Sequence, residues 1–137
     1  MKRFEYFEAT ADIGFKAYGK TMDDAFENAG LAIFNIISDT EDIEPSTEIS
    51  FEVTSEDNVS LLYDYLEELL FYHEVEFMLF SEFDVKIDDG FHLTATIKGE
   101  SINWDKHERK TEIKAITFHM MEVKRSDVIE LQAIVDL

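Results

Sequence analysis

Two stretches of the sequence carry apolar residues at helical spacing, and they limit the fold more than any other feature. Over residues 21–38, apolar side chains recur at intervals of three and four positions, which predicts an amphipathic helix. Thr21, followed three positions later by Asp24, is typical of a capped helix start. The same spacing over residues 57–75 predicts a second helix, with leucines on one face and carboxylates on the other. The fold must therefore bury one face of each helix.

Most of the remaining chain alternates between apolar and polar residues, which is the pattern of a half-buried strand. The predicted strands cover residues 3–8, 13–18, 49–53, 83–87, 91–97, 112–123 and 128–137. The segment 112–123 is long and mostly apolar, so we expect it to be a central strand. Asp88-Asp89-Gly90 predicts a hairpin turn between two of the strands. Strands joined by tight turns pair in the antiparallel direction.

A chain of 137 residues, of which 45% are hydrophobic, suits one hydrophobic core. We therefore predict a single domain over residues 1–137. Its fold class is α+β, with a mainly antiparallel β-sheet and the two α-helices packed on one of its faces. The strands near the two termini are long enough to pair with each other. Such pairing would bring Asp12 close to the C-terminus.

The charge of the chain limits its partners. It has 31 acidic residues against 12 lysines and arginines, which gives a formal net charge of −19 at pH 7. We expect no direct nucleic-acid binding, because that requires a basic stripe, and the densest basic patch, 106–114, is interrupted by Glu108 and Glu112. A surface this acidic suits binding of a cation or docking on a basic protein. It is also compatible with a role in solubility alone.

Familiar catalytic motifs are missing from the sequence. The chain has no cysteine, so thiolate zinc sites and cysteine nucleophiles are excluded. No serine lies in a G-x-S-x-G turn, and the five glycines never cluster into a phosphate-binding loop. Of the four histidines, His107 lies in a predicted loop and is the best placed for function, although a surface loop residue is the plainer interpretation. We expect a non-catalytic protein without an organic cofactor.

Carboxylates close to the chain end are the best candidates for metal ligands. Asp136 is the last residue but one, next to the free carboxylate of Leu137, and Asp12 opens a strand that can reach this end. Hard oxygen ligands of this kind favour Ca²⁺, Mg²⁺ or Mn²⁺ over zinc. The alternative for Asp12 is that it caps a turn. From composition and spacing alone, the turn cap is the favoured interpretation, because an aspartate at the start of a strand more often caps a turn.

The N-terminal residues carry two positive charges with no apolar run behind them, so we expect no signal peptide. No stretch approaches the ~20 apolar residues that a membrane-spanning helix needs. The expected location is the cytoplasm.

Five blocks of sequence, in order along the chain, resemble the archease family. They are EATADIGF over 8–15, AFENA and AIF over 25–34, SLLYDYLEELLF over 60–71, HE and EIKAITFH over 107–119, and IVDL over 134–137. The blocks span nearly the whole chain. One position departs from the pattern, because Ala9 stands where many archeases have histidine. Any role of that imidazole is absent here, while the aspartate remains.

The resemblance implies a function. Archeases activate the RtcB-type, GTP-dependent tRNA-splicing RNA ligase by promoting its guanylylation and its multiple turnover. The family binds a divalent cation through the aspartate of its T-A-D segment and an acidic residue at its C-terminus. By resemblance these ligands are Asp12 and Asp136, with an oxygen of Leu137. One alternative is a chaperone or specificity modulator of RNA-modifying enzymes such as a tRNA methyltransferase. A less favoured one is a small metal-dependent phosphoesterase that uses the same two aspartates.

Overall fold

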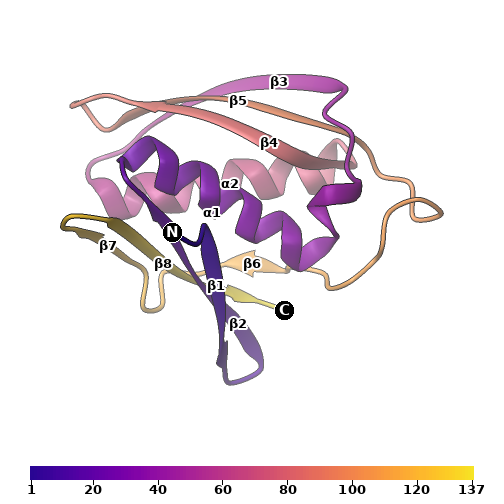
Figure 1. The fold of residues 1–137 in the computed structure, drawn as a ribbon, viewed down its shortest axis with the longest axis horizontal. Helices are drawn as coiled ribbons and strands as arrows, with labels where there is room; N and C mark the ends of the chain where they lie inside the picture. Colours follow the sequence, from indigo (N-terminus) through magenta and orange to yellow (C-terminus); the bar gives the residue numbers. More distant parts are fainter.

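The two helices form where the apolar periodicity predicts them. The computed structural model, which describes all 137 residues, has helix α1 at Met22–Ile37 and helix α2 at Asn58–Val75 (Figure 1). The Thr21 hydroxyl accepts a hydrogen bond from the Asp24 N–H at 3.1 Å, and the Asp57 carboxylate caps α2 in the same way. These side chains satisfy N–H groups that have no partner within a helix. Both predicted helices are confirmed.

The strands form two antiparallel sheets. The first has the order β1, β2, β8, β6, and β7 pairs with the same strand, β8. Its strands are β1 Phe4–Ala9, β2 Asp12–Gly19, β6 Ala115–Ile116, β7 Glu122–Arg125 and β8 Ile129–Asp136. The second sheet has the order β3, β5, β4, with β3 Thr47–Thr54, β4 Met78–Ile87 and β5 His92–Ser101. A short 3₁₀ helix, Thr40–Asp42, follows α1.

The helices lie between the two sheets, as the side view in Figure 1 shows. Each buries its apolar residues in one continuous core of 32 buried residues, in which Phe26, Phe34 and Tyr65 are among the largest side chains. The predicted α+β class with antiparallel strands and two packed helices is confirmed. The strands are divided between two sheets, so the helices are covered on two sides. No helix of the structure is long and apolar enough to cross a membrane.

Helix α1 also covers one edge of the second sheet. The carboxylate of Glu27 accepts a hydrogen bond from the N–H of Val85 at 2.9 Å, and that of Asp23 accepts one from the N–H of Ile87 at 3.0 Å. An edge strand with free N–H groups invites pairing with another chain. Burial raises the pKa of Glu27, in spite of the hydrogen bond from Val85. The two acidic side chains therefore bind N–H groups of β4 that would otherwise be free to pair with another strand.

The prediction of one central strand over 112–123 is wrong. Only Ala115–Ile116 and the start of β7 pair with β8. Between the paired positions Ile116–Val135 and Glu122–Gln132, the segment that connects β6 to β7 contains five residues, whereas the facing stretch of β8 contains two. The surplus forms a loop in which Met120 has a φ of 54° and is 54% exposed. The sequence of the segment resembles a buried strand because the loop contains Phe118, Met120 and Met121, but only Met121 is buried, while Phe118 and Met120 are exposed.

Candidate metal centre

Strands β2 and β8 bring the two predicted aspartates together. They pair in antiparallel register with Asp12 directly opposite Asp136. Residues directly opposite each other in such a pair have their Cβ atoms ~5 Å apart and project to the same face of the sheet. The two carboxylates, 124 positions apart by the difference 136 − 12, are therefore neighbours. The predicted pairing of strands near the two termini is confirmed.

A tight turn places Asp12 at the start of β2. Ala9 pairs with Asp12, so Thr10 and Ala11 alone connect β1 to β2. Ala11 has a φ of 62°, in the left-handed region, which allows the chain to reverse within these two residues. Asp12 is half-buried and Asp136 is exposed. The turn therefore holds one carboxylate next to the chain end while leaving the pair accessible to solvent.

The chain end is held on both sides of Asp136. The main-chain carbonyl of Asp136 accepts a hydrogen bond from the N–H of Lys114 at 2.8 Å, next to the pairing of Ala115 with Asp136. Leu137 is half-buried and packs against the hydrophobic core. This packing fixes the position of Leu137 next to Asp136 at the end of β8. All three predicted ligands therefore lie at one end of the β2–β8 pair.

The chemistry of these groups suits a hard cation. Like charges directly opposite each other in a sheet are destabilising, and neither aspartate takes part in any of the ion pairs of the structure. No three side chains of histidine, cysteine, aspartate or glutamate converge at a single point. Two aspartates and a terminal carboxylate would leave the remaining positions of a Ca²⁺ or Mg²⁺ shell to main-chain oxygens or water. These oxygen donors are of the type that such a cation prefers.

His107 has a different role from the one expected of a loop residue. It is 2% exposed, and its Nδ1 accepts a hydrogen bond from the N–H of Asn103 at 3.0 Å. Its Nε2 donates to a carboxylate oxygen of Glu100, also at 3.0 Å. These two bonds define the neutral tautomer with the proton on Nε2. The expectation that His107 is a surface residue is wrong. Its buried ring connects Asn103 in the loop to Glu100 in β5, and so holds the loop against the strand.

Glu100 accepts the hydrogen bonds that hold this loop, and its pKa makes their contribution to the stability of the fold depend on pH. Burial raises the pKa of Glu100, but hydrogen bonds from Lys106, the N–H of Glu44 and His107 outweigh burial and lower it to about 2. A carboxylate whose pKa is lower in the folded than in the unfolded state stabilises the fold above the unfolded pKa. This contribution is lost as the pH falls from about 4.5 towards 2.

We expect Glu100→Gln to be less stable than the parent protein at pH 7, with the difference shrinking as the pH falls towards 2. The amide accepts the hydrogen bonds from Lys106 and His107 less strongly than the carboxylate does. Urea denaturation at a series of pH values measures the effect. The matched control is Glu48→Gln, at an exposed carboxylate 4.0 Å from Lys98. A difference that does not depend on pH would contradict the prediction.

Comparisons with known proteins identify the family. Residues 4–137 match the model of the Archease protein family (MTH1598/TM1083). The chain is 55% identical to the Protein archease of Methanothermobacter thermautotrophicus, with all of both chains covered. It is 46% identical to the Protein archease of Pyrococcus furiosus, with 91% of this chain and 90% of the relative covered.

A solved structure agrees with these sequence matches. The solution structure of Methanobacterium thermoautotrophicum protein 1598 superposes with a TM-score of 0.89 at 54% identity, and all of both chains is covered. The same family is found by the match over residues 4–137, by the full-length relatives and by this structure. The chain belongs to the archease family.

Proposed function

We propose that this protein activates a GTP-dependent, RtcB-type tRNA-splicing RNA ligase, by promoting guanylylation of the ligase and its repeated turnover. Membership of the archease family supports the activity. The observation that carries the site assignment is the register of β2 and β8, in which Asp12 and Asp136 face each other. We place the activating group at these residues and at the terminal carboxylate of Leu137.

The charge of the protein favours action on the ligase rather than on RNA. At a net charge of −19, the protein repels phosphate backbones and is attracted to the basic surface on which a ligase holds RNA. Charge complementarity speeds such an encounter and makes it sensitive to salt. Since protein and RNA would compete for the same basic surface, the protein is expected to act between rounds of ligation.

The role of the chain's own residues follows from the site. Asp12 and Asp136 would hold an oxygen-ligated divalent cation, with Leu137 adding its terminal carboxylate. A bound divalent cation supplies charge neutralisation and orientation for phosphate groups. The β1–β2 turn and the packing of Leu137 hold the carboxylates in place, so little ordering is needed when the ligase binds. The protein itself needs no nucleophile for this work, and we propose that it is not an enzyme.

The test is a turnover assay with the protein, its cognate ligase, GTP, a divalent metal salt and RNA in excess over the ligase. We expect single turnover without the protein and multiple turnover with it. With labelled GTP, guanylylation of the ligase should be faster in the presence of the protein than in its absence. No gain in either quantity would refute the proposed function. Hydrolysis of a phosphoester by the protein alone would point instead to a metal-dependent phosphoesterase.

A further inference from the structure

The residue that follows helix α2 has an unfavourable conformation for its type. Phe77 comes directly after the C-cap, Glu76, and has a φ of 56°. This position is usually filled by glycine or asparagine, because a bulky side chain is strained in the left-handed region. Burial does not explain the phenylalanine, since its side chain is 68% exposed. Strain of this kind is often kept for function.

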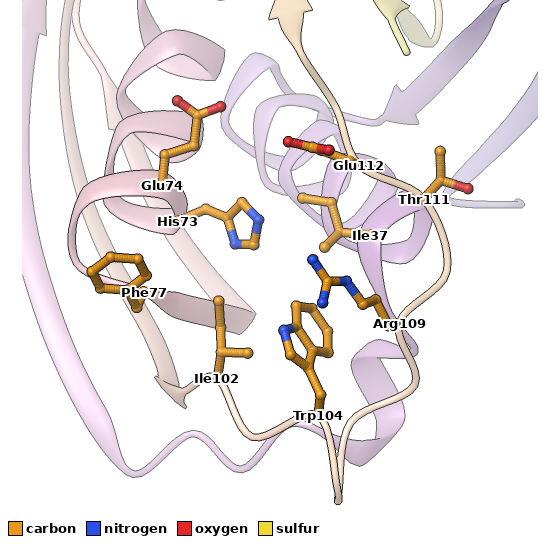
Figure 2. A pocket seen from close by; sticks show the side chains of 9 residues that line it. All are labelled: Ile37, His73, Glu74, Phe77, Ile102, Trp104, Arg109, Thr111 and Glu112. Atoms are coloured by element: carbon orange, nitrogen blue, oxygen red, sulfur yellow. The ribbon is translucent and has the colours of Figure 1, made fainter.

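Phe77 borders a pocket of about 430 Å³ at the C-terminal ends of the two helices. Ile37, Ile102 and Trp104 provide further apolar walls, and Figure 2 shows His73 and Arg109 entering from opposite sides. The guanidinium of Arg109 lies 5.0 Å from the centre of the Trp104 ring. A concave, mostly apolar pocket beside an exposed aromatic residue is where a protein partner inserts an anchor side chain.

Helix α2, which contributes His73 and Glu74 to the pocket, also has exposed apolar residues near its C-terminal end. Phe71 and Val75 are exposed and, being four positions apart, lie on the same side of the helix. We call Phe71, Val75 and Phe77 the α2-end surface. Exposed carboxylates surround it: Glu67 one turn before Phe71, Glu74 and Glu76 at the helix end, and Glu112 at the pocket. An apolar patch with an acidic rim complements an apolar side chain flanked by lysine or arginine.

We propose that the α2-end surface and its pocket are the docking site for the ligase, which presents an apolar anchor side chain among basic residues. This inference rests on the proposed function and adds the contact that holds the two proteins together. The docking site and the candidate metal centre are connected by a short stretch of chain. Glu112 lines the pocket, and the N–H of Lys114, two residues later, bonds to the carbonyl of Asp136. A partner anchored at the pocket is therefore close to Asp12 and Asp136.

The experiment compares ligase affinity with thermal stability for Phe77→Asn, which removes the exposed ring and suits the left-handed backbone. We expect the Kd for the cognate ligase, measured by calorimetry at low salt, to rise about tenfold. The Tm is expected to stay the same or to rise by a few degrees. The matched control is Met120→Asn, since Met120 is also apolar, 54% exposed and at a φ of 54°, but lies in the loop over β8. The control is expected to keep its affinity.

A second variant tests the acidic rim without altering the ring. Glu74→Lys combined with Glu76→Lys is expected to weaken binding about tenfold at low salt and by less at high salt. Unchanged affinity in either variant, or a lower Tm for Phe77→Asn, would overturn the docking site. Parent protein that fails to bind the ligase would overturn the proposed function as well. If the parent protein binds the ligase and the Phe77 and rim variants bind it with the same affinity, the docking site fails while the proposed function stands.

Discussion

Asp12→Asn and Asp136→Asn are each expected to reduce the stimulation of ligase guanylylation at least tenfold, on the order of the loss in metal affinity that follows damage to a metal site. The reason is the β2–β8 register, which places the two carboxylates opposite each other. An amide oxygen keeps the shape of the side chain but removes the charge that binds a divalent cation. The rate of guanylylation with labelled GTP measures the effect.

The same variants have a second readout that does not involve the ligase. Because a ligand that binds only the folded state raises its stability, added Ca²⁺, Mg²⁺ or Mn²⁺ should raise the Tm of the parent protein. The rise should be smaller in either variant. Without metal, each substitution also removes one of two like charges that face each other, so the variants should be no less stable than the parent protein.

Asp127→Asn is the matched control, because Asp127 is an exposed aspartate in the turn before β8. It should keep both the stimulation and the metal-dependent rise in Tm. Full stimulation by Asp12→Asn combined with Asp136→Asn would remove the metal centre from the mechanism while leaving the ligase as partner. A metal-dependent rise in Tm that survives in the double variant would place the cation elsewhere.

Gly99→Ala should cost on the order of 3 kcal/mol of unfolding free energy, the upper end of the usual range for overpacking. A Cβ atom at residue 99 would lie 1.8 Å from the carbonyl oxygen of Leu79 and 2.7 Å from the Cα of Phe80. These are backbone atoms of β4, next to the register shift between Phe80 and Glu82. They cannot move aside as a flexible side chain would, so the two strands must separate locally. Urea denaturation measures the loss.

Gly90→Ala is the comparison for this effect. A Cβ atom there would meet its nearest neighbour, an oxygen of Asp88, at 3.4 Å, which is ordinary contact. Gly90 is exposed and its φ is not positive, so alanine should change the stability by less than about 1 kcal/mol. Gly99→Ala with stability within about 0.5 kcal/mol of the parent protein would contradict the expected backbone clash.

The spacing of apolar residues along the chain was sufficient to predict both helices. In both helices apolar residues recur at intervals of three and four and are buried in the core, so this periodicity predicts them. It did not predict that α1 is covered on both sides or that α2 exposes Phe71 and Val75. In β2 the more deeply buried residues alternate in part with half-buried ones, whereas β8 is buried on both faces from Leu131 to Val135. The segment 112–123 failed because its burial is not periodic. Ile116 is buried, while Phe118 and Met120 are exposed beyond the point where the strand breaks.

His107 and Phe77 show the other limit of sequence interpretation. A histidine in a polar loop looks exposed, and its burial depends on Glu100, seven positions earlier on a strand. Phe77 looks like a core residue, and its exposure depends on the turn that ends α2. Neither contact leaves a periodic signal, because each involves a single side chain. The pocket beside Phe77 was not predicted for the same reason, since its lining comes from separate segments.

The sequence by itself determined the fold class, the two helices and the acidic character, because these depend on local spacing and on residue type. The candidate ligands Asp12, Asp136 and Leu137 came from the resemblance to the archease family. The tertiary structure alone decided that the strands divide into two sheets, that Asp12 stands opposite Asp136, and that an exposed Phe77 borders a pocket. Those features depend on register and on contacts between distant segments. Alternation allows several registers, and only packing of the whole core selects one.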